Sequence, residues 1–217
     1  MGFLAAIGSA IGSAIGSFIS TTVGKLGSAI AAGVKYLSTV AGPILSKVAD
    51  VISAISSILD ITKDNERPED LGAKAATAEK KVDDFDSYKD YINYLNNDVE
   101  LTDEIKEKLK DEKFKAECTC IGAAIQWHGI DEKMELNMGV PDATRLVEAG
   151  VNTVEAFKTI SDTFKENNVE PRINDAIEYK LPIDEKVEVI DTLKEGVEKI
   201  DNSKEIWDKL DKMLEDI

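Results

Sequence analysis

The chain has 217 residues, enough for one or two domains with a substantial hydrophobic core, and its formal net charge is −16. So negative a protein repels the phosphate backbone of nucleic acids and anionic lipid head groups, and we therefore expect no nucleic-acid partner. The only two cysteines, Cys118 and Cys120, are too few and too close for a disulfide framework. They predict a reducing compartment or indifference to redox conditions.

The charge is unevenly distributed along the chain. Residues 1–60 carry three lysines against two aspartates, a net charge of +1, whereas the remaining 157 residues carry a net charge of −17. We therefore predict an apolar helical module over residues 1–61, a charged linker over residues 62–70, and an acidic all-α domain over residues 71–217.

The first module begins with Ala-Ile-Gly-Ser repeated three times, from Ala6 to Ser17. On a helix of 3.6 residues per turn, a period of four advances by about 40° per repeat, so the glycines form an inclined groove beside a ridge of isoleucines. Such a groove lets a second helix approach closely. Each interior Gly costs about 1 kcal/mol relative to Ala, so we expect this helix to be ordered only when packed in protein or lipid. The candidate residues for packing in a membrane or a homo-oligomer are Phe3, Ile7, Gly8, Ile11, Gly12, Ile15, Gly16 and Phe18.

Residues 3–24 hold no charged side chain, and as a helix they would extend over about 33 Å, the thickness of a bilayer's hydrocarbon core. Their apolar side chains favour insertion by roughly 0.3–0.6 kcal/mol each, while four Ser, two Thr and four Gly oppose it. The two contributions nearly cancel. An oligomer that satisfies its own serines is therefore expected to insert more readily than a monomer. No Sec-type signal peptide is indicated, since no Lys or Arg precedes the apolar run and no Ala-x-Ala site follows it.

The apolar pattern changes after residue 24. Large apolar residues then recur every seven positions from Ile30 to Ile58, as in helices that associate side by side. Gly42 and Pro43 are expected to break this run into two helices. We predict that the module lies in or crosses a membrane as a helical hairpin. The alternative is that its helices are buried in this chain's own core or in a larger assembly.

The acidic part shows helical periodicity and no strand alternation, which predicts an all-α fold with short loops and antiparallel neighbours. Pro68 is expected to open a helix that runs to about Asp84. Gly150 is expected to close a short helix, and Asn152 with Glu155 to open the next one as a capping box.

Residues 136–157 resemble a helix-hairpin-helix element. The resemblance implies two helices joined by a tight turn. Pro141 stands where the family places its second hairpin glycine, and because it has no N–H it cannot donate to a phosphate. The family's DNA contact is therefore not expected here. The residues that match the pattern are Gly139, Ala149, Gly150, Thr153 and Glu155.

No catalytic motif is found, so we expect no enzymatic activity and no cofactor. Cys118, Cys120 and His128 lack a fourth ligand and fit no zinc spacing, so we interpret them as core side chains and predict no metal site. No Gly-x-Ser-x-Gly elbow and no phosphate-binding loop occur.

Acidic helical faces remain, and they are either solvated or bind a basic protein partner or chaperone. They include Asp83, Asp84, Asp86, Glu185, Glu188 and Asp191.

Two hypotheses of function follow from the sequence. The first is a membrane-active protein that permeabilises or penetrates a lipid bilayer, such as a secreted toxin or effector, or a virion or phage penetration protein delivered in a particle. The second is a structural component of a particle or injection machine whose N-terminal helices oligomerise.

Overall fold

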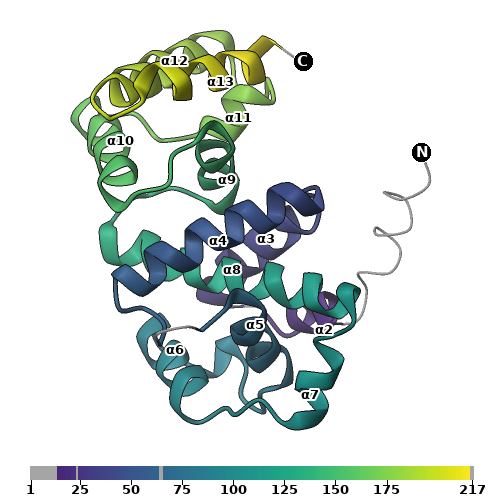
Figure 1. Ribbon diagram of the computed structural model, residues 1–217. Helices are drawn as coiled ribbons and strands as arrows, with labels where there is room; N and C mark the ends of the chain where they lie inside the picture. Colours follow the sequence, from purple (N-terminus) through teal and green to yellow (C-terminus); the bar gives the residue numbers. More distant parts are fainter. Residues whose placement is uncertain (1–13, 23, 64–65, 216–217) are drawn as a thin grey trace. The chain divides into compact units, whose positions relative to one another are not determined.

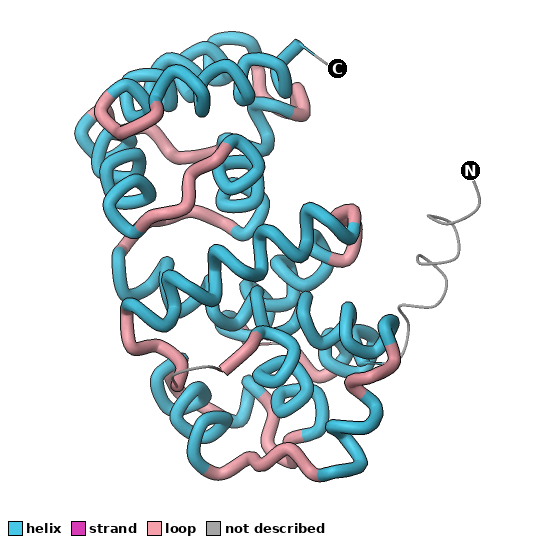
Figure 2. Tube along the Cα trace, viewed as in Figure 1, coloured by secondary structure: helices cyan, strands magenta, loops and turns pink. Residues whose placement is uncertain are grey.

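The computed structural model describes residues 14–22, 24–63 and 66–215. These residues form twelve α-helices and one short 3-10 helix without any strand, which confirms the all-α fold class (Figures 1 and 2). Part of the predicted packing surface lies outside the described residues, namely Phe3, Ile7, Gly8, Ile11 and Gly12.

The chain divides into two compact units, Met1–Gly129 and Ile130–Ile217. The division falls inside helix α8 (Glu112–Met134) and not at residues 62–70, where composition suggested a linker. The apolar helices that follow the glycine repeat therefore belong to the same unit as the first half of the acidic part.

From residue 14 onward, the described N-terminal part of the first unit forms three helices: α2 (Ala14–Ser20), α3 (Lys25–Leu37) and α4 (Gly42–Ile58). The break between α3 and α4 lies where the sequence suggests it. Pro43 occupies the first turn of α4, where its missing N–H leaves no hydrogen bond unmade.

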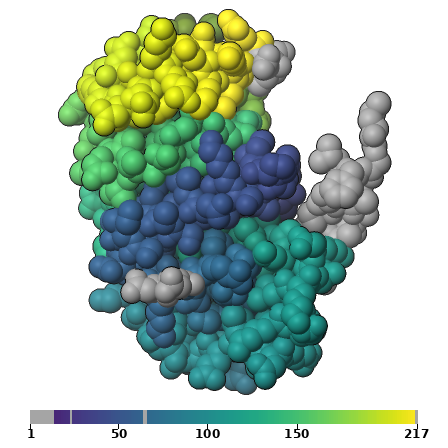
Figure 3. Space-filling view, in the orientation of Figure 1, coloured from purple at the N-terminus to yellow at the C-terminus, as the bar shows by residue number. Residues whose placement is uncertain are grey.

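Helices α3 and α4 are amphipathic, and each buries one face. Their other faces carry Lys35, Lys47 and Asp50, which are exposed. Figure 3 shows α4, in blue, at the surface of the first unit. Burial of the apolar faces is thus achieved within the chain. The buried side chains with at most 1% exposure are Ile30, Val34, Leu37, Val48, Ile52 and Ile55.

Helix α5 (Pro68–Thr77) crosses α8 where each helix carries a glycine. An ideal Cβ on Gly72 would lie 1.8 Å from the carbonyl oxygen of Cys118, and one on Gly122 would lie 1.8 Å from the carbonyl oxygen of Pro68. Real Cβ atoms do not come this close to another atom, so only glycine fits on either helix. The two backbones are in direct contact at this crossing.

The helix that starts at Pro68 is shorter than the sequence suggests, and its expected end near Asp84 is wrong. Ala78 leaves the helical conformation at φ −56°, ψ 145°. Its carbonyl accepts a 2.6 Å hydrogen bond from Lys81 Nζ, and the Thr77 hydroxyl donates to the carbonyl of Ala73 at 2.7 Å. The Lys81 side chain thus satisfies the Ala78 carbonyl, which a longer helix would have used for its next hydrogen bond.

Helices α6 (Tyr88–Asn97) and α7 (Asp103–Lys108) complete the first unit. Each begins at a residue whose hydroxyl caps it: Ser87 accepts from the N–H of Asp90, and Thr102 accepts from that of Ile105. The 3-10 helix η1 (Val82–Asp84) precedes α6 and packs against α3.

The described part of the second unit contains the end of α8 followed by five complete helices. Helices α10 and α12 pack most closely, and an ideal Cβ on Gly196 would lie 3.2 Å from the Cα of Ile160. Gly150, with φ 119°, ends α9 in the left-handed conformation that favours glycine. The next helix begins one residue later than the predicted capping box places it, because Thr153 and not Asn152 caps it by accepting from Ala156 N–H at 3.2 Å. The five helices are α9 (Val140–Ala149), α10 (Val154–Glu166), α11 (Ile173–Ile177), α12 (Ile183–Glu198) and α13 (Ser203–Glu215).

Candidate functional site

Helix α2 is the described part of the predicted membrane segment, and a narrow apolar face attaches it to the first unit. Its buried residues are Ala14, Ile15 and Phe18, with 8%, 5% and 4% of their surface exposed. Helix α2 packs on α3 and α5. Two of the predicted packing residues, Ile15 and Phe18, therefore lie against the chain's own helices.

Gly16 lies on the opposite side of α2 and is exposed. An ideal Cβ built on Gly16 meets no atom within 4 Å. No described residue therefore packs against the glycine side of α2 at this position. The close helix contact that the repeat predicts does not occur here within the described residues.

A buried carboxylate meets the start of α2. Glu117, which is 1% exposed, accepts a hydrogen bond from the backbone N–H of Ala14 at 2.8 Å through its Oε2. Its Oε1 is buried and has no hydrogen-bond partner among the described residues. A carboxylate is stabilised by the free N–H groups of a helix start, but its burial is costly unless such bonds are made. The attachment of α2 and the burial of Glu117 therefore depend on each other.

The connection between α2 and α3 is fixed to η1. The N–H of Gly24 donates to Asp83 Oδ2 at 2.9 Å. An ideal Cβ on Gly24 would lie only 2.7 Å from Asp83 Oδ1, and one on Gly27 would lie 2.5 Å from the same atom. Asp83 is thus not part of a solvated acidic face, as the sequence suggested, because it binds the backbone at the start of α3. This contact anchors the chain to η1 at a point between α2 and the helices that follow.

The number of buried apolar side chains differs greatly between α2, which precedes that contact, and α3 and α4, which follow it. Full burial of one large apolar side chain contributes about 1.5–3 kcal/mol, so the Ile and Phe of α2 contribute roughly 3–6 kcal/mol before the entropy of ordering is subtracted. Helices α3 and α4 bury seven Ile, Leu and Val side chains. Detaching α2 is therefore far less costly than detaching α3 and α4.

No helix among the residues that the structure describes is both long enough and apolar enough to cross a bilayer.

The cysteines and the histidine lie in α8. Burial raises the pKa of Cys118 and that of Cys120 to about 12, so both thiols stay protonated at neutral pH and are poor nucleophiles. The ring of His128 packs edge-on against Tyr88, with 5.4 Å between ring centroids. Within the described parts of the chain, no group of three His, Cys, Asp or Glu side chains is arranged to hold a metal ion.

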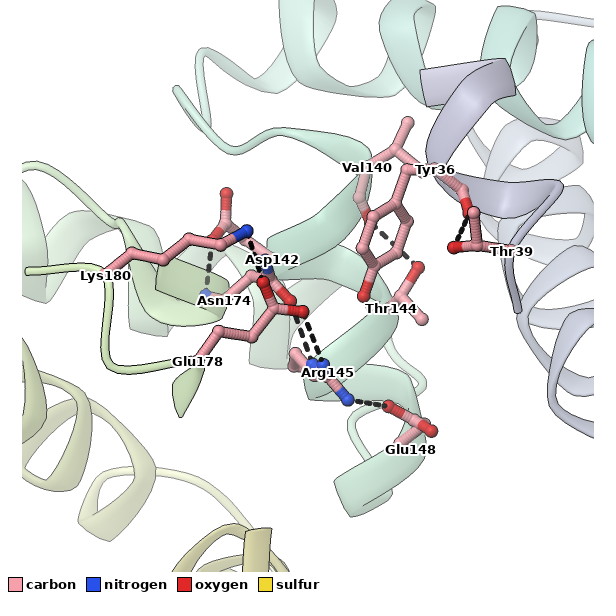
Figure 4. A network of polar contacts seen from close by, with 10 residues as sticks. All are labelled: Tyr36, Thr39, Val140, Asp142, Thr144, Arg145, Glu148, Asn174, Glu178 and Lys180. Atoms are coloured by element: carbon pink, nitrogen blue, oxygen red, sulfur yellow. Dashed lines mark hydrogen bonds and ion pairs between the residues drawn. The ribbon is translucent and has the colours of Figure 1, made fainter. Parts of the chain in front are cut away.

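The second unit contains a polar network that the sequence did not reveal (Figure 4). The guanidinium of Arg145 on α9 donates to Asn174 Oδ1 at 3.0 Å, to Glu178 at 3.1 Å and to Glu148 at 3.3 Å. Planar guanidinium groups favour such multiple contacts. The network joins α9 to α11, and its donors are already engaged with acceptors of the same unit. Its role is therefore structural.

Asp142 belongs to the same network. Burial raises the pKa of Asp142 to about 6, although the N–H groups of Asn174 and Gly139 lower it. Its two carboxyl oxygens accept from these N–H groups at 2.9 Å and 3.1 Å. It also lines a cavity of about 610 Å³ with Ser161 and Arg172. Because both oxygens already bind backbone, this carboxyl caps helices and does not serve as a free base.

The segment that resembles a helix-hairpin-helix element consists of α9, a tight turn at Gly150 and α10. Pro141 lies in the first turn of α9, as its missing N–H favours. Gly139 and Pro141, the hairpin positions of the resemblance, thus stand at the start of α9, and the turn at Gly150 follows that helix. Comparison of the chain with protein-family models, with curated proteins and with solved structures found no match.

Proposed function

We propose that the protein is membrane-active and that its active element is the uncharged segment of residues 1–24, carried on a helical body that includes α3 and α4. The observation that carries this proposal is the contrast in attachment. The segment holds no charged side chain, and its described helix α2 buries one Ile, one Phe and one Ala, whereas the following helices form much of the core.

The membrane-active segment proposed here, residues 1–24, is shorter than the module of residues 1–61 that the sequence suggested. Residues 1–61 were expected to enter the membrane together, but α3 and α4 already have their apolar faces covered. Moving them into lipid would expose their partners in the first unit to water and gain little. Residues 1–24 alone have the length for a bilayer, and the open side of Gly16 leaves room for a second helix.

The rest of the chain, residues 25–217, carries the net negative charge and has a role in the proposed function. Its charge opposes adsorption to anionic lipid, so contact with a membrane is confined to the uncharged segment. The partners proposed are a lipid bilayer and other copies of the chain. Delivery by secretion or within a particle would bring the segment to its target.

Dye leakage from vesicles of zwitterionic lipid tests the proposal with the full chain. We expect the wild-type protein to release dye and the Gly12→Leu variant, which fills the proposed groove, to release it at least about tenfold more slowly. Ser13→Leu adds the same side chain beside the groove and is the matched control, expected to retain leakage. No leakage by the wild type, or equal loss in both variants, would contradict the proposal.

A second candidate function is assembly within a particle or injection machine. It is favoured by the burial of α3 and α4 in the chain's own core and by the open glycine side of α2, which suits a neighbouring protein helix as well as lipid. Sedimentation without lipid separates the two. Oligomers that form in buffer and are lost in Gly12→Leu would support assembly, whereas a monomer that associates only on vesicles would support membrane activity.

A further inference from the structure

An exposed apolar face occurs on the second unit, at the start of α12. Four large apolar side chains are exposed among the residues described, and three of them lie here: Tyr179, Ile183 and Val187, at 54%, 71% and 49%. Ile183 and Val187 are four residues apart and therefore neighbours on one side of the helix. Exposed apolar side chains gathered in this way are typical of a binding surface.

The face is ordered in advance of any binding. Lys186 Nζ lies 3.0 Å from the centroid of the Tyr179 ring, and the Tyr179 hydroxyl donates to the carbonyl of Leu214 at 2.8 Å. These contacts hold the aromatic ring beside the first turn of α12. A surface held in this way loses little side-chain entropy when a partner binds.

A groove runs beside the apolar residues. It encloses about 550 Å³, and its lining includes Val187, Glu188 and Asp191. None of its described lining residues is basic, and five are carboxylates: Asp184, Glu185, Glu188, Asp191 and Glu195. Glu185 pairs with Arg172, and Glu195 pairs with Lys199.

Asp184, Glu188 and Asp191 make no ion pair with any described residue. Their mutual repulsion would be relieved by cations from outside the unit. The carboxylates extend from position 184 to position 195, roughly 16 Å along α12, which is about three helical turns. Apolar side chains next to a carboxylate row on one helix match a partner whose own apolar and basic faces adjoin.

We infer that this face of α12 is a docking surface for a basic amphipathic helix of a partner protein. Its apolar side would cover Ile183 and Val187, and its Lys or Arg side chains would meet Asp184, Glu188 and Asp191. The net negative charge of the second unit disfavours three other kinds of partner at this face. Residues 130–217 carry 23 acidic and 12 basic side chains, so a second copy of this unit, a nucleic acid or an anionic membrane would be repelled. The inference does not depend on the uncharged N-terminal segment.

Fluorescence anisotropy with the full chain tests the inference. The probe is a labelled synthetic helix of about 18 residues with Leu on one face and Lys on the other. We expect saturable binding that weakens with salt, and about tenfold weaker binding to the double variant Ile183→Ser, Val187→Ser. Both side chains are exposed, so the variant is expected to fold. A peptide of the same composition in scrambled order, without an apolar face, is expected to bind at least about tenfold more weakly.

Charge reversal provides the matched comparison. The pair Glu188→Lys, Asp191→Lys is expected to weaken binding by at least about tenfold. The pair Asp208→Lys, Asp211→Lys changes the net charge equally at exposed positions of α13 and is expected to change binding by less than about twofold. No binding of the amphipathic probe, equal effects of the two pairs, or an unaffected serine variant would overturn the inference.

Discussion

Two regions of the first unit carry glycines on helices, and they use them in opposite ways. Where α5 crosses α8, Gly72 and Gly122 bring the backbones together, and a Cβ on either would overlap a carbonyl oxygen. On α2, Gly16 borders open space. Gly16, the one glycine of the repeat among the described residues, therefore lies on a surface that those residues leave free, while two glycines outside any repeat form the close helix contact. Regular spacing alone does not say which glycine is packed.

One glycine-to-alanine substitution in each region tests this comparison directly, and the first of them has the largest expected effect. Gly122→Ala places a Cβ against the backbone of α5, and we expect it to lower the free energy of unfolding by about 4 kcal/mol. Gly16→Ala is the matched control, because it has space and gains helix propensity, and is expected to stabilise α2 by up to about 1 kcal/mol. Chemical denaturation measures both. Equal effects would remove the distinction between the two glycines.

Core burial of α4 is the next test. Ile52 is fully buried, so Ile52→Ala is expected to cost about 3 kcal/mol of unfolding free energy. Ile58, at 68% exposed in the last turn of the same helix, serves as the control, and Ile58→Ala is expected to change stability by less than about 0.5 kcal/mol. If Ile52→Ala were as mild as Ile58→Ala, α4 would not be part of the body that the proposal requires.

The docking of α2 on the first unit is expected to depend on the carboxylate of Glu117 in α8. Glu117→Ala leaves the N–H of Ala14 without its acceptor, which is expected to weaken the docking of α2 by about 2 kcal/mol. Hydrogen exchange of α2 amides would then be about thirtyfold faster while α4 is unchanged. Glu112→Ala removes an exposed carboxylate from the same helix and is expected to leave α2 exchange unaltered. Faster exchange throughout the unit would show that α2 does not open separately.

Asp142 is a second carboxyl that accepts hydrogen bonds from backbone N–H groups at helix starts. Its expected effect on the free energy of unfolding is the smallest of those considered. Its pKa of about 6 in the folded chain exceeds the ordinary value of 3.8. Between these values the folded protein keeps a proton that the unfolded chain loses, so the free energy of unfolding falls as pH rises through this window. We expect this fall to be roughly 1–2 kcal/mol, since the carboxyl stays partly accessible.

The Asp142→Asn variant isolates that contribution. Its asparagine does not titrate, so the difference in α9 hydrogen exchange between the wild type and the variant should change between about pH 4 and pH 6 and stay constant above. A pH-independent difference would contradict the raised pKa.

The sequence predicted the helical class and many helix ends, because these depend on local chemistry. Pro43 and Gly150 act through backbone geometry that is visible in the chain itself. The glycine repeat is typical of a helix with a small-residue side, but it does not indicate that Gly16, its described glycine, faces away from the core.

What could not be predicted depends on residues distant in sequence. Ala14 and Glu117 are 103 residues apart, and neither stands out in composition. The same is true of the Arg145 network, whose partners are 29 and 33 residues away. The linker expected at residues 62–70 was inferred from polarity, yet Glu69 is 8% exposed and Glu66 pairs with Lys74 at 2.6 Å. Polarity does not distinguish a solvated segment from one that is ion-paired.

The central claim is that residues 1–24 enter a bilayer while α4 stays in the body, and labelling with an environment-sensitive fluorophore tests it most directly. Ser17→Cys and Ser46→Cys each place a thiol at an exposed position of α2 or α4, and the buried native cysteines are not expected to react. With zwitterionic vesicles, the label at position 17 is expected to brighten and be quenched by nitroxide-bearing lipid, whereas the label at position 46 is not. Lipid quenching at both positions, or at neither, would contradict the account.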